Sequence, residues 1–292
     1  MNYYLVSYNR LGGKSGMAKW NKITQEEIST VVNGGKTASE LSVLLNRSLH
    51  TIYKISRKYN VKFDNKPPRK YHLNESFFSE WTNDMAYVMG FIAADGCVLD
   101  NSRSGNPSVI EIGLAVKDFD HLNAIRDIIC KDLIVKKREK SVRLCICSKK
   151  MATDLIEIGI TQRKSTTLKF PQIPKQYVRH FIRGYFDGDG YIRVSKTKRF
   201  GHSYKNLEVS MLGTKDFLYS IREIFSKIYG KEVGSIRNQE KWYNAWRLTY
   251  STKSAKDFAK WIYEGDDITK LNRKYCIYRD FIELSSVERK VY

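Results

Sequence analysis

The sequence predicts an α+β protein built from two similar αββαββα units that follow a small all-α domain. Three observations predict this fold class. A glycine-containing apolar block occurs twice, alternating apolar and polar residues follow each copy, and the N-terminal residues have the apolar spacing of helices. Two copies are too few for a solenoid and indicate a pseudo-two-fold arrangement. The expected segments are 1–63 for the all-α domain, 64–83 for a basic linker, 84–174 for the first unit and 175–292 for the second.

The charge of the chain indicates a polyanionic partner. Its 292 residues include 51 Lys+Arg against 31 Asp+Glu, which gives a formal net charge of +20. Nucleic acid is the first candidate, and an anionic membrane surface is the second. The longest uncharged apolar stretch, residues 85–94, is far shorter than the roughly 20 residues that cross a bilayer. The sequence also lacks a matching amphipathic segment, so we expect nucleic acid and no membrane.

The cysteines and the first residues bear on the cellular compartment. The five cysteines form no CxxC pair and have no histidine at zinc-ligand spacing, so we expect reduced thiols without disulfides or zinc. The first residues lack the basic start and apolar run of a secretory signal. We therefore expect a cytoplasmic protein, in a bacterial, phage-host or organellar interior. Splice-junction nucleophiles are missing at both ends, so an intein is not expected.

Residues 1–63 are expected to contain a helix-turn-helix. Two capping boxes that begin at Thr24 and Thr37 start the first two helices, and Ser48 caps a third. The residues of the third helix expected to face inward are Ile52, Ile55 and Tyr59. Its opposite, basic stripe consists of His50, Lys54, Arg57 and Lys58. A basic second helix after a tight turn is typical of DNA-binding modules. The alternative is a three-helix bundle whose basic face is only solvated.

The linker is also strongly basic. The run Lys66-Pro-Pro-Arg-Lys70 is extended by its prolines. Lys66, Arg69 and Lys70 are therefore candidate contacts to a phosphate backbone, and the alternative reading as a plain tether is compatible with that role.

The repeat is visible in several blocks in the same order. Residues 86–96 match 180–190 at an offset of 94, and residues 110–114 match 207–211 at an offset of 97. The strands of both units alternate between apolar and polar side chains, which predicts antiparallel sheets covered by helices on one face. The other face would be polar and basic, and a twisted basic ribbon of this kind can enter a DNA groove.

The repeated block is a helix that carries the candidate chemistry. Small residues four positions apart allow two helix backbones to approach closely. The small residues expected at this interface are Gly90, Ala94, Gly184 and Gly188. A glycine follows each helix, and the last side chain before it is an aspartate, Asp95 in the first copy and Asp189 in the second.

Pairing of these helices would bring Asp95 and Asp189 together at two negative helix ends. Close like charges raise a pKa and are costly unless a cation lies between or beside them. Oxygen-only ligation suits Mg²⁺ or Mn²⁺, and metals held by two carboxylates promote in-line phosphodiester displacement. A single Asp-Gly would more simply be a turn that ends a helix. Its duplication in a strongly basic protein favours a metal site.

Residues 88–96 and 182–190 resemble the two motifs of a double-motif, monomeric LAGLIDADG homing endonuclease. The resemblance covers about residues 71–284, and an N-terminal helix-turn-helix module is compatible with it. Other segments similar to the family are 77–81, 159–165 and 170–171. The resemblance implies a saddle of antiparallel sheets over the major groove of double-stranded DNA. It also implies that a monomer cuts one phosphodiester per strand of a long, asymmetric site and leaves short 3′ overhangs.

The resemblance also assigns residues. It implies metal binding by Asp95 and Asp189, and a catalytic lysine at the end of the second strand of each unit, where Lys117 and Lys215 fit at an offset of 98. The alternative is that Lys117 and Lys215 are ordinary lysines at strand ends, without a catalytic role. Ala93 replaces the usual acid of the first motif. The expected DNA contacts on the sheets are Arg143, Arg193, Ser195 and Arg247.

The alternative function on this scaffold is a non-cleaving DNA-binding regulator or an RNA-splicing maturase. Retention of both acidic residues favours cleavage, because binding alone would need neither of them.

Overall fold

The computed structural model describes residues 23–33, 35–63, 71–100, 107–199, 202–239, 244–265 and 268–288. The chain divides into two compact units, residues 1–70 and 71–292, and each is described by itself. The expected backbone contacts Lys66, Arg69 and Lys70 lie outside the described residues.

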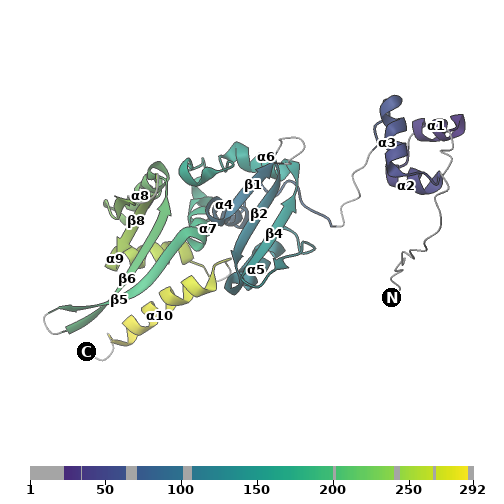
Figure 1. The fold of residues 1–292 in the computed structure, drawn as a ribbon. Helices are drawn as coiled ribbons and strands as arrows, with labels where there is room; N and C mark the ends of the chain where they lie inside the picture. Colours follow the sequence, from purple (N-terminus) through teal and green to yellow (C-terminus); the bar gives the residue numbers. More distant parts are fainter. Residues whose placement is uncertain are drawn as a thin grey trace. The chain divides into compact units, whose positions relative to one another are not determined.

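The first unit contains three short helices around a small apolar core (Figure 1). They are α1 (Gln25–Val32), α2 (Ala38–Leu44) and α3 (Leu49–Lys58). Thr24 and Thr37 form the two expected capping boxes, and Ser48 accepts a hydrogen bond from the amide of Thr51. The fully or almost fully buried residues are Val31, Ala38, Leu41, Ile52 and Ile55. The inward position expected for Tyr59 is wrong: this residue follows the end of α3 and is 40% exposed.

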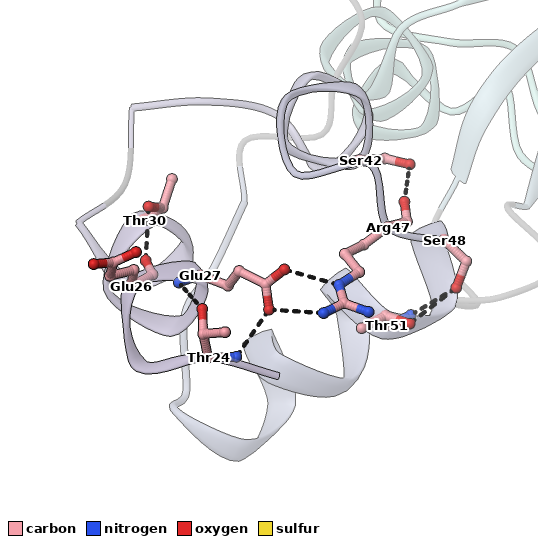
Figure 2. A network of polar contacts seen from close by, with 8 residues as sticks. All are labelled: Thr24, Glu26, Glu27, Thr30, Ser42, Arg47, Ser48 and Thr51. Carbon is pink, nitrogen blue, oxygen red and sulfur yellow. Dashed lines mark hydrogen bonds and ion pairs between the residues drawn. The ribbon is translucent and has the colours of Figure 1, made fainter. Parts of the chain in front are cut away.

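An ion pair fixes the turn between α2 and α3 (Figure 2). Arg47 donates from Nε to Glu27 Oε1 at 2.8 Å and from Nη2 to Glu27 Oε2 at 3.1 Å. The amide of Thr24 donates to the same Oε2 at 2.9 Å, so one carboxylate serves both the cap of α1 and the turn. The hydrogen bond from Arg47 is the main cause that lowers the pKa of Glu27. The network ties α1 to the start of α3.

The second unit contains two αββαββα repeats and one further helix (Figure 1). The first repeat consists of α4 (Asn83–Asp95), β1 (Gly96–Asp100), β2 (Pro107–Ala115), α5 (Phe119–Ile129), β3 (Lys136–Lys137), β4 (Ser141–Cys147) and α6 (Lys149–Ile158). The second consists of α7 (Val178–Asp189), β5 (Gly190–Arg199), β6 (His202–Gly213), α8 (Lys215–Tyr229), β7 (Ser235–Asn238), β8 (Trp246–Ser251) and α9 (Thr252–Tyr263). The further helix is α10 (Asn272–Glu288). Short 3₁₀ helices, η1 (Val116–Asp118), η2 (Lys164–Thr166) and η3 (Lys175–Tyr177), lie in the connections.

Each repeat forms one four-stranded antiparallel sheet, in the order β1-β2-β4-β3 or β5-β6-β8-β7. Gly96 is opposite Ile112 in the first sheet, and Gly190 is opposite Met211 in the second. By this register, equivalent positions of β2 and β6 are 99 residues apart in the sequence (112 and 211), rather than the 97 expected from the repeat. The error of two residues kept the alternation correct, because side chains on a strand repeat every second residue.

Helices cover one face of each sheet and leave the other open. Helices α5 and α6 pack on the first sheet, and α8 and α9 pack on the second. Alternate strand residues such as Ile112 and Leu144, or Met211 and Leu248, are buried under them. Residues 71–82 also join this core, with Phe78 only 2% exposed. The sequence had placed these residues in a linker, but their aromatic side chains pack on the second unit.

Helices α4 and α7 lie side by side between the two sheets (Figure 1). A Cβ atom at Gly90 would lie 2.0 Å from the carbonyl oxygen of Phe181, and one at Gly184 would lie 2.0 Å from that of Tyr87. A Cβ at Gly188 would lie 2.4 Å from the Cβ of Ala94. The two backbones therefore touch, and only glycine fits at these contacts.

We predict that Gly184→Ala destabilises the second unit by about 3 kcal/mol, the upper end of the usual cost of overpacking, because the new methyl group would meet main-chain atoms that cannot rotate away. Gly113→Ala is the matched control, since no heavy atom lies within 4 Å of a Cβ at Gly113. Denaturant unfolding followed by fluorescence measures both variants. Equal stability of the two variants would contradict the close approach of α4 and α7.

Candidate active site

The paired helices bring two carboxyl groups together at their C-terminal ends. Asp95 is the last residue of α4 and Asp189 is the last residue of α7. A Cβ atom at Gly188, the residue before Asp189, would lie 3.3 Å from Oδ2 of Asp95. The two acids thus share one small region, at the point where both helices continue into the first strands of their sheets.

The surroundings make ionisation of these carboxyls unfavourable. Both aspartates are exposed residues, yet enough protein surrounds their carboxyl groups for burial to dominate their pKa values. Burial is the main cause that raises the pKa of Asp189 to about 6, and the charge of Asp95 raises it further. Burial also raises the pKa of Asp95. Positive charge at this place would therefore stabilise the ionised pair.

Two buried lysines supply part of that positive charge. Lys164 in η2 is 7% exposed and donates from Nζ to the carbonyl oxygen of Gly96, directly after α4. Lys274 in α10 is 3% exposed and donates to the carbonyls of the last turn of α7. Its acceptors are Phe186, Asp187 and Gly188, at 2.7, 2.8 and 3.0 Å. Each helix end, where the dipole is negative, therefore has a cation against it.

Burial lowers the pKa of both lysines, that of Lys274 to about 8, and the nearby aspartates oppose this effect. Lys164 and Lys274 lower the pKa values of both Asp95 and Asp189. The four groups thus form one electrostatic cluster.

These lysines are different from those expected from the sequence. Lys117 is exposed in η1, and Nζ of Lys215 lies 5.2 Å from the ring centre of Trp246. Each is the second residue after its strand, since β2 ends at Ala115 and β6 at Gly213, although the strand register differs by 99 residues and these lysines by 98.

Lys164 and Lys274 each follow the last helix of their repeat, which is a signal the sequence contains. The segment before Lys274 is longer, and this insertion hides the correspondence. Lys164 follows the last helix of its repeat by 6 residues, since α6 ends at Ile158. Lys274 follows the last helix of its repeat by 11 residues, since α9 ends at Tyr263.

A buried aspartate holds the segment that presents Lys274. Asp187 is 1% exposed and accepts hydrogen bonds from Tyr87, Tyr263 and the amide of Leu271, each at 2.8 Å. Arg273, next to Lys274, forms a bidentate ion pair with Asp118 of the first repeat. Its Nε donates to Oδ1 at 2.8 Å and its Nη2 donates to Oδ2 at 3.1 Å. The start of α10 is thus anchored to both repeats. The matched residue of the first motif, Ala93, makes no such contact because it has no polar side chain.

The four sheet residues expected to contact a ligand lie on the open faces. They are Arg143, Arg193, Ser195 and Arg247. Two of the arginines have acidic partners that were not expected from the sequence. Arg193 donates to both oxygens of Glu208, directly opposite on β6, at 3.0 and 3.1 Å, and Arg143 donates to Glu111 at 3.2 Å. Strand alternation could have revealed both glutamates, because they share the polar face with the arginines.

The donor set fits a hard divalent cation. Asp95 and Asp189 offer carboxylate oxygens whose pKa values are raised, mainly by burial, and a cation beside them would favour the ionised forms. Within the described ranges, no group of three or more His, Cys, Asp or Glu residues is arranged to hold a metal by itself. Carboxylate oxygens are ligands that hard divalent cations take, together with water and phosphate oxygens.

Two further observations concern the cysteines and the lengths of the helices. All five cysteines are free thiols. In the part of the chain that is described, every helix is too short or too polar to span a bilayer.

Comparison with known proteins places this site in context. Residues 176–263 match the model of the LAGLIDADG-like domain. The structure is similar to that of the LAGLIDADG meganuclease I-AabMI bound to uncleaved DNA, with a TM-score of 0.50 and 12% identity over 72% of this chain and 92% of that one. For the I-SmaMI LAGLIDADG homing endonuclease bound to cleaved DNA, the TM-score is 0.49, with 15% identity over 72% and 91% of the chains. The first of these similarities shows a shared fold.

A curated relative matches over much of the chain. It is a probable translation initiation factor IF-2 of Methanocaldococcus jannaschii, 26% identical over 205 residues, or 66% of this chain. The chain spans only 16% of the length of that protein.

Proposed function

We propose that this chain, which carries a LAGLIDADG-like domain and has the fold of a LAGLIDADG meganuclease, is a site-specific double-stranded DNA endonuclease of the homing type. The observation that carries the proposal is the cluster of Asp95, Asp189, Lys164 and Lys274 at the junction of two sheets with polar, arginine-bearing open faces. The net charge of +20 supports a polyanionic substrate.

In this proposal Asp95 and Asp189 hold divalent cations, Mg²⁺ or Mn²⁺. When bound, such a cation lowers the pKa of water and stabilises charge on the phosphate oxygens. Hydrolysis consumes one water per strand: an oxygen–phosphorus bond forms, the bond to the leaving ester oxygen breaks, and a proton ends on that oxygen.

The lysines differ in what their hydrogen bonds allow. Lys274 directs hydrogen bonds to three backbone carbonyls, so it acts on the reacting phosphate as a fixed positive charge rather than as a proton donor. Lys164 holds the matching place beside Gly96 in the other repeat. Both charges are positioned before the substrate arrives, which avoids reorganisation during the reaction.

The N-terminal unit extends the DNA contact in this proposal. The stripe of His50, Lys54, Arg57 and Lys58 is exposed along α3, as a recognition helix requires. A single chain would thereby bind a long asymmetric duplex as a monomer.

We predict that Asp95→Asn and Asp189→Asn each reduce cleavage by more than about 100-fold while duplex binding persists, because even residues behind metal ligands typically contribute 10- to 100-fold. The substrate is selected from randomised duplexes with wild-type protein in Ca²⁺, then tested with Mg²⁺. Selection of a duplex without its cleavage in Mg²⁺ or Mn²⁺ would favour a DNA-binding regulator. If the duplex selection fails and a parallel selection from randomised structured RNA succeeds, a maturase is favoured.

We predict that Lys164→Met and Lys274→Met each slow single-turnover cleavage by about 10²- to 10³-fold, the usual effect of removing a preorganised charge. Lys117→Met and Lys215→Met are the controls and should change the rate only a few-fold. Binding in Ca²⁺ reports whether each variant is folded. A large loss confined to the two controls would contradict the assignment made from the structure.

A further inference from the structure

The strand registers allow the open faces of the two sheets to be compared position by position. Directly after the helix that ends in Asp95, Cys97 lies opposite Glu111. At the matched place in the second sheet, Tyr191 lies opposite Ser210. A glutamate in the first repeat therefore corresponds to a serine in the second, in the strand pair that continues from the carboxylate-bearing helices.

The neighbouring arginines are equivalent in the two sheets. Arg143 lies opposite Gly113, and Arg247 lies opposite Leu212. Nη1 of Arg143 donates to Oε2 of Glu111 at 3.2 Å, and the thiol of Cys145 donates to the same oxygen at 3.6 Å. Arg143 is thus held by an acid that the second sheet lacks at the matched place.

Arg247 instead borders an open space beside the second carboxylate. A pocket of about 300 Å³ is lined by Asp189, Tyr191, Ser210, Leu212 and Arg247. The arginine of the second repeat therefore shares a pocket with the proposed catalytic carboxylate, and Ser210 contributes no charge to it.

At the next pair on this face, Arg193 and Glu208 of the second sheet match Leu99 and Val109 of the first, a difference without net charge. The positions that flank the two arginines carry equal charges. Lys136 lies opposite Arg143, and Arg237 lies opposite Arg247. The remaining matched pairs are uncharged: Cys97 with Tyr191, and Gly113 with Leu212. Across these matched positions the two halves differ by one negative charge, that of Glu111.

We propose that Glu111 makes the two halves of the active centre unequal, an inference that rests on the endonuclease function proposed above. Glu111 repels phosphate and competes with it for Arg143, whereas Arg247 is available to the phosphate at the second half. The strand attacked at the second half is therefore bound more strongly and cut first. The strand attacked at the first half is cut later, so cleavage proceeds through a nicked duplex with a fixed strand order.

The ion pair between Arg143 and Glu111 is weak enough for a phosphate to replace Glu111 as the partner of Arg143. The side chain of Arg143 is 48% exposed and that of Glu111 is 19% exposed. Ion pairs of this exposure contribute little to stability, so removal of Glu111 should leave the fold intact.

The test uses the full chain and a supercoiled plasmid that carries a duplex selected as described above. Wild-type protein should accumulate nicked circles with the nick in one defined strand. Glu111→Ser, which copies the second half, should speed the second cut about two- to five-fold, the size expected for one exposed ion pair. In Ca²⁺, the slope of log Kd against log salt should steepen by about 0.9, because one more phosphate is contacted.

Two variants separate this account from simpler ones. Glu208→Ser releases Arg193 from its ion pair three residues beyond Gly190, so it should change affinity without changing strand order. Adding Arg143→Gln to Glu111→Ser should remove the gain in both the second cut and the salt slope.

Unchanged nicking and an unchanged salt slope in Glu111→Ser would overturn the inference, as would a gain that persists after Arg143→Gln. If wild-type protein selects a duplex and cuts it, the proposed function stands whichever result Glu111→Ser gives. If it selects and cuts no duplex, the proposed function fails, and this inference fails with it.

Discussion

The close contact of α4 with α7 is the constraint on which the rest of the second unit depends. Glycine at 90, 184 and 188 lets the two backbones touch, and any Cβ at these places would overlap the neighbouring helix. Because Gly188 in the last turn of α7 lies against the last turn of α4, the terminal residues Asp95 and Asp189 lie close together. A pair of acids at two negative helix ends is unfavourable for stability. The geometry therefore favours a role in which cations are bound.

The protein surrounds this cluster with fixed positive charge from segments that follow each repeat. Lys164 and Lys274 fill the space under the two helix ends, where their hydrogen bonds satisfy backbone carbonyls. The anchoring of α10 by Asp187 and Asp118 shows that the position of Lys274 depends on both repeats. Two repeats with the same architecture thus form one shared centre, and they differ in detail at Ala93 and Asp187, and at Glu111 and Ser210.

Much of this arrangement could be predicted from the sequence, because the repeat, the strand alternation and the small-residue spacing are local patterns. The order of elements, the helix contact and the paired aspartates follow from them. The lysines did not follow, since an insertion before Lys274 hides its correspondence with Lys164. The acidic partners of Arg143 and Arg193 depend on strand register, which the repeat offsets misplaced by two residues. Tyr59 was misplaced because α3 ends one residue before it.

The pKa of Asp189, measured by carbon-13 NMR titration in metal-free buffer, tests the central claim most directly. The account predicts a value of about 6 in the wild-type protein. In Asp95→Asn the value should fall, because a repelling charge is removed, yet it should stay above the ordinary range because burial is the larger cause. The same pKa in both proteins, or an ordinary value in the wild type, would show that the two carboxyls do not share one site.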